Sequence, residues 1–368
     1  MPAQFLETMT RFLLPTMLLA VVSAFAQIPA GYYNTATGTG YTLKTQLYNI
    51  IKDHTNNGYD GLYDTYQTSD RDYFYENDGT ILDMYSERPN AADPYNFSAG
   101  ASQRCGNYSH EGDCYNREHI IPQSVFDEAQ PMKSDAHFIV PSDGKVNGYR
   151  SNYPFGVVGN ATYTSQNGSK LGQASNTGYA AGYSGIVFEP IDEFKGDIAR
   201  MYFYFATRYQ NVITGFGSYA MFDGTSNHVF SNTFLEILKH WNAQDPVSQR
   251  EIVRNNAIYA TQNNRNPFID HPEWVETIWG NMLAAPSVDL AAKISIYPNP
   301  GVNHIINVVS ENDIDAIEII TINGQIMQRI EKPTMDNHTY SISNLPNGFY
   351  LMKLTVGNQS ATKKIIVN

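Results

Sequence analysis

The spacing of apolar residues changes near residue 285, and this change constrains the fold more than any other feature. Upstream, apolar residues recur at helical spacing, as in the stretch 192–209. Downstream, short alternating strands are separated by turns such as Asn323-Gly324, and no helical period appears. The sequence therefore predicts two domains, a mixed helix-and-strand domain followed by a small all-β sandwich.

Within the upstream part, the pattern predicts a first helix over about 43–51 and an amphipathic helix over about 192–209. Asp245-Pro246 and His271-Pro272 each indicate a helix start, because proline is favoured in the first turn. The stretch 143–185 is rich in Gly, Asn, Ser and Tyr, and beyond a short helix it is predicted to form long loops.

The N-terminal end is typical of a secretory signal peptide. Arg11 precedes the apolar run 12–26, which closes with Ala24-Phe25-Ala26. This run is short for the ~20 residues that cross a bilayer, and no later segment is apolar enough to span one. We expect a signal peptide over 1–26, no stable membrane span, and an exported chain.

Charge and cysteine content exclude several classes of protein. The net charge is −12, and because six basic and six acidic residues balance within 291–368, the negative charge lies in the middle of the chain. A domain that held DNA through a broad basic surface would be positive. Only two cysteines are present, which excludes a disulfide-rich scaffold and a cysteine-based zinc cluster.

The C-terminal segment carries several motifs in series. They are Ile-Tyr-Pro-Asn-Pro at 296–300, Asn323-Gly324, the stretch 345–350 and the Lys-Lys-Ile-Ile-Val ending at 363–367. These motifs resemble the type A sorting domain of the type IX secretion system. The resemblance implies export across an outer membrane by that machinery.

Ionisable residues crowd around two short apolar runs, Ile120-Ile121 and 138–140, and a short helix is predicted over 143–150. A strand with His119, a loop, a second strand and a helix with Asn147 form a ββα hairpin. Such a hairpin can place a general base and a metal ligand on either side of one phosphate.

The stretches 116–119, 135–137 and 147–156 resemble the signature of the endonuclease I family, secreted nucleases of the ββα-metal (His-Me finger) type. Further matches follow in the expected order at 78–86, 188–190, 195–200, 245–248 and 264–273. The resemblance implies an α+β fold, a mixed nuclease domain built around a ββα-metal motif and followed by the β-sandwich.

The resemblance also implies the roles of individual residues. Glu118 and Asn147 match the ligands of one divalent metal, expected to be Mg²⁺, with Mn²⁺ or Ca²⁺ as alternatives. His119 matches the general base that deprotonates the attacking water, and at its ordinary pKa of ~6.5 it would be neutral at mild pH. Arg150 is expected to stabilise the transition state, with Lys133 as the other candidate.

Other candidates have supporting roles. Asp135 and His137 are possible outer-shell residues, and His137 could serve only to orient the hairpin. Phe138 stands where many relatives carry a second histidine, so that histidine is not essential here. Cys105 and Cys114 are nine positions apart in an exported protein, and we expect a disulfide between them.

The predicted organisation is a signal peptide over 1–26, a nuclease domain over 27–285, a linker over 286–292 and a sorting domain over 293–368. The predicted function is a secreted, sequence-nonspecific, metal-dependent endonuclease that cleaves DNA, and possibly RNA, to 5′-phosphate products. We expect a monomer in the extracellular space or at the cell surface. The alternative is a non-catalytic surface adhesin that binds glycan or nucleic acid through its aromatic loops.

Overall fold

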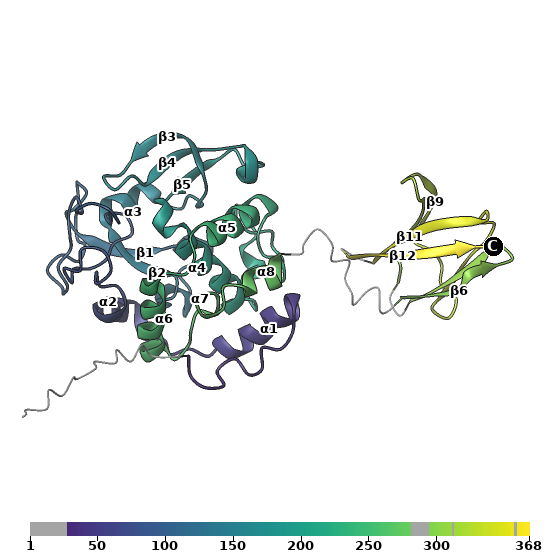
Figure 1. Cartoon of the computed structure of the whole chain (residues 1–368), viewed down its shortest axis with the longest axis horizontal. Coiled ribbons are helices and arrows are strands. Elements are labelled where there is room, and N and C mark those ends of the chain that lie inside the picture. Colours follow the sequence, from purple (N-terminus) through teal and green to yellow (C-terminus); the bar gives the residue numbers. More distant parts are fainter. Residues whose placement is uncertain (1–27, 281–293, 311–312, 357–358) are drawn as a thin grey trace, which may run out of the picture. The chain divides into compact units, whose positions relative to one another are not determined.

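The computed structural model describes residues 28–280, 294–310, 313–356 and 359–368. The chain divides into two compact units between Trp279 and Gly280 (Figure 1). The predicted signal peptide and the predicted linker lie outside the described residues. In the part of the chain that is described, no helix has the length and apolar character needed to cross a bilayer.

The first unit contains helices around a largely aromatic core. They are α1 (Gly40–Ile51), α2 (Gly58–Ser69), α3 (Gly144–Arg150), α4 (Lys195–Arg208), α5 (Asn232–Gln244), α6 (Gln249–Gln262), α7 (Pro267–Asp270) and α8 (Trp274–Trp279). The predicted helix over 43–51 is confirmed by α1. A helix is also confirmed within 192–209, where a 3₁₀ turn (Asp192–Phe194) leads into α4.

The prediction that this second helix is amphipathic is wrong. Every residue of α4 is buried, including Asp197 and Arg200. Its polar residues form ion pairs inside the fold, and Arg200 Nε lies 2.6 Å from Glu251 Oε1 on α6. Paired charges can be buried where unpaired ones cannot, so a helix with a polar stripe can pass through the middle of the domain.

The predicted helix start at Asp245-Pro246 is also wrong, because α6 begins at Gln249. Ser248 caps the helix by accepting a hydrogen bond from the amide of Glu251, and the Glu251 side chain accepts from the amide of Ser248. This reciprocal capping box satisfies two amides that a helix otherwise leaves unpaired.

Strands β1 (Tyr115–His119) and β2 (Ile139–Asp143) pair antiparallel and lead into α3. The predicted order of strand, strand and helix is therefore present, and the first strand ends at His119 as predicted, whereas the apolar pair Ile120-Ile121 was also expected to be a strand. Ile120 and Ile121 follow β1, and both are fully buried. The polar sequence 116–119 forms the strand because it pairs with a fully buried partner, β2.

A second sheet corrects the prediction of long loops over 143–185. Strands β3 (Val158–Thr164), β4 (Lys170–Ala174) and β5 (Ile186–Glu189) form an antiparallel sheet in that order. Most of β3 is exposed, so its side chains carry no alternation of buried and exposed residues from which a strand could be predicted. The sheet lies above α3 and α5 in Figure 1.

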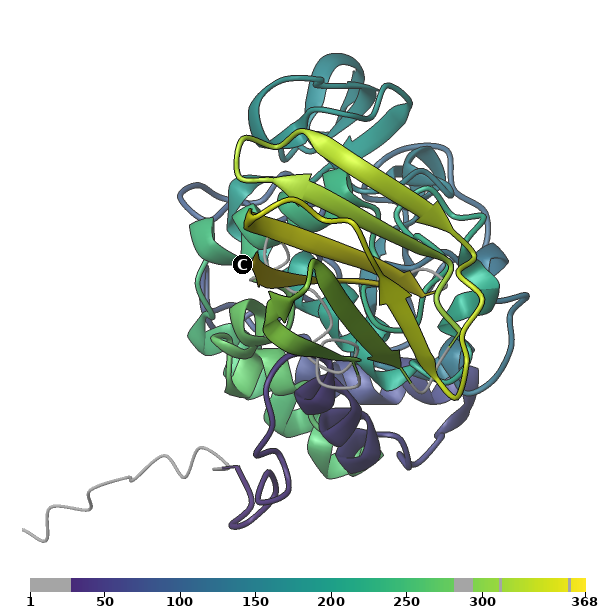
Figure 2. The ribbon, with the colours of Figure 1, turned by 90° about the vertical axis from the view of Figure 1, so that its right-hand side faces the viewer.

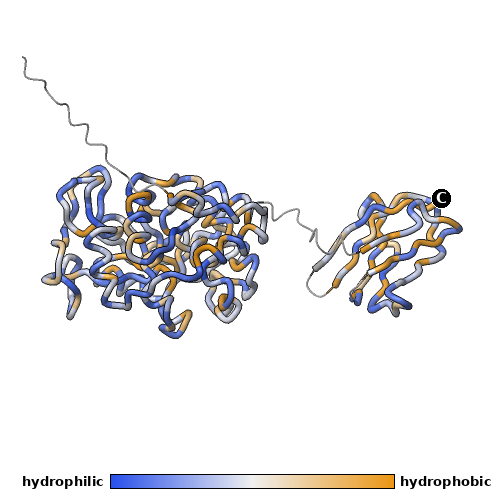
Figure 3. The backbone as a smooth tube through the Cα atoms, turned by 90° about the horizontal axis from the view of Figure 1, so that it is seen from below, coloured by the Kyte–Doolittle hydropathy of each residue, from blue (hydrophilic) through white to orange (hydrophobic). Residues whose placement is uncertain are grey.

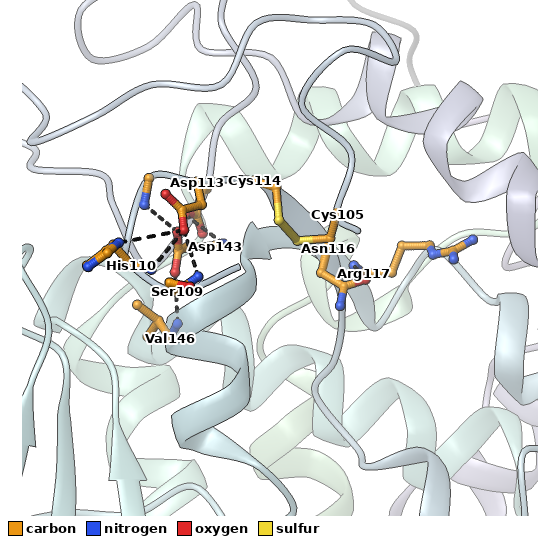
Figure 4. Close-up of a disulfide and its surroundings, with 11 residues drawn as sticks. Cys105, Ser109, His110, Asp113, Cys114, Asn116, Arg117, Asp143 and Val146 are labelled. Atoms are coloured by element: carbon orange, nitrogen blue, oxygen red, sulfur yellow. Dashed lines mark hydrogen bonds and ion pairs between the residues drawn. A yellow bond between two sulfur atoms is a disulfide. The ribbon is translucent and has the colours of Figure 1, made fainter. Parts of the chain in front are cut away.

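The predicted disulfide between Cys105 and Cys114 is present, with Cα atoms 4.8 Å apart. It ties the loop before β1 to the residue that precedes that strand (Figure 4). A closed loop of this kind typically stabilises a fold by ~2–4 kcal/mol.

The second unit is all-β, as predicted, and Figure 2 shows its strands in green and yellow. Its strands are β6 (Ile294–Val302), β7 (Ile305–Ser310), β8 (Ala316–Thr321), β9 (Ile326–Glu331), β10 (Thr339–Ile342), β11 (Gly348–Val356) and β12 (Gln359–Val367). Among the described residues they are ordered β10-β7-β6-β12-β11-β8-β9. Alternate residues such as Ile317 and Ile319 are buried, and apolar and polar stretches alternate along the strands in Figure 3.

Candidate active site

Two strands and a helix position the residues that were predicted to carry the chemistry. Glu118 and His119 are the last two residues of β1, opposite Val140 and Ile139 of β2. Asp143 ends β2 and caps α3, because its Oδ1 accepts a hydrogen bond from the amide of Val146 at 2.8 Å. The cap fixes where α3 begins, and thereby where Asn147 and Arg150 lie.

Arg150 joins the helix to the end of the first strand. Its Nη1 donates to the carbonyl of His119 at 2.7 Å, and its Nη2 donates to the carbonyl of Ile120 at 2.5 Å. Its Nη1 also lies 3.2 Å from Oε1 of Glu118, and both side chains are buried. The planar guanidinium therefore holds the strand end and the carboxylate in one arrangement.

Glu118 is 1% exposed and is held by two partners. Besides Arg150, the hydroxyl of Tyr85 donates to its Oε1 at 2.8 Å. Burial raises the pKa of Glu118, whereas the charge of Arg150 and the hydrogen bond from Tyr85 lower it. Both partners act on Oε1, and among the described residues no hydrogen bond reaches Oε2.

His119 is 4% exposed and lies among the rings of Tyr59, Phe126 and Phe138. Its Nε2 lies 3.2 Å from the carbonyl of Lys133. A carbonyl only accepts, so a hydrogen bond at this contact requires the proton on Nε2. Burial lowers the pKa of His119 to about 4, although the carbonyls of Lys133 and Arg117 act in the opposite direction.

Asn147 is half-buried and lies one turn before Arg150 on the same face of α3. No hydrogen bond of the Asn147 side chain is found among the described residues. The amide of Asn147 and Oε2 of Glu118 are thus oxygen donors without protein partners, on two elements that Arg150 holds together. Such a donor set fits Mg²⁺, which prefers oxygen ligands and keeps several of its waters.

The structure places the predicted phosphate-binding cations away from solvent or in ion pairs. Arg150 is 1% exposed, and its guanidinium is packed over the ring of Phe155 at 4.6 Å. Lys133 forms an ion pair with Glu128. Lys145, on the first turn of α3, is half-buried and lies over the ring of Tyr149 at 5.1 Å.

Asp135 and His137 lie in a polar network inside the domain rather than beside Glu118. Oδ2 of Asp135 accepts hydrogen bonds from Tyr204 and Tyr209, both at 2.8 Å. Nε2 of His137 lies 3.0 Å from the carbonyl of Asn264. Burial acts to raise the pKa of Asp135, yet the imidazoles of His54 and His137 and the amide of Gln262 lower it on balance. The network joins the loop before β2 to the chain that follows α6.

Burial also lowers the pKa of His137 to about 4, against the opposing charge of Asp135. In the unfolded chain the pKa is ~6.5, so the unfolded state binds the proton first as pH falls. His137 therefore supports the fold fully above about pH 6.5, and this support is lost progressively down to about pH 4. We expect its titration to lower the free energy of unfolding by about 2–3 kcal/mol between pH 7 and pH 4.5.

Urea unfolding of wild type and His137→Gln at the two pH values measures this effect. The glutamine does not titrate, so the loss on acidification should be smaller in the variant by that amount. Equal losses in both proteins would show that His137 is charged in the folded state or is not buried there.

Two residues that contact the site, Tyr85 and Asp83, were not predicted to be part of it. Tyr85 bonds to Glu118, and Asp83 accepts a hydrogen bond from the amide of Asp143 at 2.9 Å through its Oδ2. Both lie in the stretch 78–86, which matched the family signature in order. That match is the signal from which they could have been found.

Comparison with known proteins identifies relatives for both units. The family model described as endonuclease I matches residues 39–273, and the one described as secretion system C-terminal sorting domain matches residues 295–368. The chain is 34% identical over 272 residues to an extracellular ribonuclease of Bacillus amyloliquefaciens, covering 73% of this chain and 84% of that protein.

Two further relatives have similar names. An extracellular ribonuclease of Bacillus subtilis (strain 168) is 35% identical over 257 residues, which cover 67% of this chain and 78% of that protein. Endonuclease-1 of Buchnera aphidicola subsp. Baizongia pistaciae is 27% identical over 140 residues, 38% of this chain and 47% of that protein.

Proposed function

This chain belongs to the endonuclease I family of nucleases and is secreted, and we propose that it is a metal-dependent, sequence-nonspecific endonuclease acting on DNA and RNA. One observation carries the proposal. Among the described residues, Glu118 Oε2 and the Asn147 side chain have no hydrogen-bond partner, and the residue after Glu118 in β1, His119, carries a buried imidazole whose pKa is lowered to about 4. The names of the two Bacillus relatives support RNA as a substrate, and the family supports nucleic acid in general.

In this proposal Glu118 and Asn147 hold one Mg²⁺ ion. When bound, the ion supplies positive charge to the phosphate and to the leaving 3′ oxygen. His119 takes the proton of the attacking water on the ring nitrogen that carries the lone pair of the neutral imidazole. Products would carry 5′-phosphate and 3′-hydroxyl ends.

The contacts of Arg150 favour a positioning role over direct contact with the phosphate. Two carbonyls and Glu118 occupy the guanidinium, and the side chain is 1% exposed. The charge of Arg150 lowers the pKa of Glu118, whereas burial raises it. Arg150 therefore helps to keep Glu118 ionised.

An acidic nuclease is compatible with this chemistry. An enzyme that releases its products needs only modest affinity, and sequence-independent phosphate contacts can provide it.

Metal removal tests the proposed function. Purified protein should cleave plasmid DNA and total RNA in Mg²⁺, lose this activity in excess EDTA, and regain it when Mg²⁺ is restored. A surface adhesin would bind either substrate, or neither, without cutting it. Cleavage that persists after complete chelation would contradict the proposed metal dependence.

A further inference from the structure

The loop between α2 and β1 brings several carboxylates together outside the candidate active site. Possible ligand atoms of Asp72, Glu76 and Glu87 all lie within 4.8 Å of one another. Asp72 and Glu87 are 2% and 1% exposed, whereas Glu76 is at the surface. Two buried carboxylates and an exposed one thus share a small volume.

One oxygen of the Glu87 carboxylate has no hydrogen-bond partner among the described residues. This oxygen, Oε1, is inaccessible to solvent. Burial, together with the charges of Asp93, Glu76 and Asp72, raises the pKa of Glu87 to about 9. Buried polar atoms nearly always have a hydrogen-bond partner. A buried carboxylate oxygen without one, inside an acidic cluster, therefore indicates that a positively charged partner is missing.

Arg250, the basic side chain whose charge acts on Glu87, forms its ion pair with another carboxylate. Arg250 lowers the pKa of Glu87 through its charge, but its ion pair is with Asp197, and it packs over the ring of Phe194 at 5.3 Å. Arg88, the neighbour of Glu87, donates through its side chain to the carbonyl of Gln166. Among the described residues, neither guanidinium forms an ion pair or a hydrogen bond with Glu87.

Backbone hydrogen bonds hold the carboxylate of Asp72 and the main chain of Glu87. Oδ1 of Asp72 accepts from the amides of Phe74 at 3.1 Å and Tyr75 at 3.0 Å. The amide of Glu87 donates to the carbonyl of Asp83 at 3.0 Å. The carboxylate of Asp72 is thus pre-positioned, which reduces the ordering that a ligand must impose there.

We propose that Asp72, Glu76 and Glu87 form a second cation site, which binds Ca²⁺ and is distinct from the site at Glu118 and Asn147. Ca²⁺–oxygen bonds of about 2.3–2.6 Å place opposite ligands up to about 5 Å apart, which covers every separation up to the limit of 4.8 Å within which these ligand atoms lie. Mg²⁺, with bonds of about 2.0–2.1 Å, spans only about 4.2 Å and demands a stricter octahedron.

The site would stabilise the loop that supports the active site. Tyr85, two residues before Glu87, donates its hydroxyl to Glu118. A Ca²⁺ ion that joins Asp72 to Glu87 would close the segment that contains Tyr85 and Asp83. The proposal concerns binding and stability, so it does not depend on the proposed nuclease function.

Thermal unfolding of the mature, full-length protein in CaCl₂ tests the proposal without nucleic acid. The background variant Asn147→Ala removes one ligand of the active-site metal. In this background we expect Ca²⁺ at a hundredfold excess over its Kd to raise Tm by about 5–10 °C. Mg²⁺ at the same concentration should raise it less.

Substitutions locate the effect. Glu87→Gln, which keeps the shape of the side chain, should abolish the Ca²⁺-dependent rise in Tm. Glu76→Gln, at the surface and so harmless to folding, should reduce it and shift the Ca²⁺ midpoint at least tenfold upward. Asp78→Asn, in the same loop but outside the cluster, should leave the rise unchanged.

Two results would overturn the proposal. One is a Tm of the Asn147→Ala protein that is insensitive to millimolar Ca²⁺, which would mean that Glu87 is simply protonated. The other is a Ca²⁺-dependent rise that persists in both Glu87→Gln and Glu76→Gln, which would place the ion elsewhere.

Discussion

His119→Ala should lower the rate of phosphodiester cleavage by ~10²–10⁴-fold at saturating Mg²⁺, the usual contribution of a positioned general base. The imidazole is held by the Lys133 carbonyl and kept neutral by burial. Neither Glu118 nor Asn147 bonds to the ring, so metal binding should persist in the variant. Single-turnover cleavage and Mg²⁺ titration of the two proteins measure the two effects separately.

The control for this experiment is His137→Gln. His137 is also a buried, neutral histidine of this domain, but it bonds to Asn264 in the interior network. We expect it to lower stability with at most a small loss of rate at neutral pH. A His119→Ala protein that cleaves at the wild-type rate would show that another group activates the water.

The pH profile of the wild type tests the same role of His119. The neutral ring is the active form, and its pKa is lowered to about 4 by burial, so the rate should hold on acidification from pH 7 to about pH 5. The rate should then fall as pH approaches 4. A histidine at its ordinary pKa of ~6.5 would instead lose activity near that pH.

Glu118→Gln should weaken Mg²⁺ binding and the cleavage rate together, by more than the ~10–100-fold typical of removing an outer-shell partner. The amide keeps the volume of the side chain and can still accept from Tyr85, so the loss would reflect the missing charge. Partial recovery at high Mg²⁺ concentration is expected, because the variant still has the Asn147 ligand. Isothermal titration and cleavage across a Mg²⁺ series provide the measurement.

Glu118→Gln also leaves the buried Arg150 guanidinium without its carboxylate, and this would destabilise the fold. Tyr85→Phe separates the two effects, because it removes a hydrogen bond to Glu118 and keeps the Arg150 pair. We expect an intermediate loss of Mg²⁺ affinity in Tyr85→Phe with near wild-type stability. Unchanged Mg²⁺ affinity in Glu118→Gln would remove Glu118 from the metal site.

The sequence by itself predicted those elements that depend on residues close to one another in the chain. Alternating apolar residues and Asn-Gly turns predict the strands of the second unit closely, since a strand with one buried face must alternate. The short helix over 144–150 was also predicted, and its cap, Asp143, is its neighbour in sequence. The disulfide followed from two cysteines nine positions apart in an exported chain.

Only the tertiary structure decided what depends on contacts between distant segments. Strand β1 is polar and forms because β2 pairs with it, and α4 carries charges into the core because α6 supplies their partners. The same holds for the candidate site. Arg150 was expected to stabilise the transition state, and only the fold shows that its guanidinium contacts the carbonyls of His119 and Ile120 and the carboxylate of Glu118.

The electrostatic state of the site was likewise decided by burial. His119 and Glu118 have ordinary pKa values in an unfolded chain, and the fold lowers the first and raises the second because it removes water from both. The proposed Ca²⁺ site has the same origin, since Asp72 and Glu87 are fifteen positions apart and meet only in the folded loop. Burial of a side chain and its contacts with distant segments depend on the folded structure around it, and these cannot be read from the sequence.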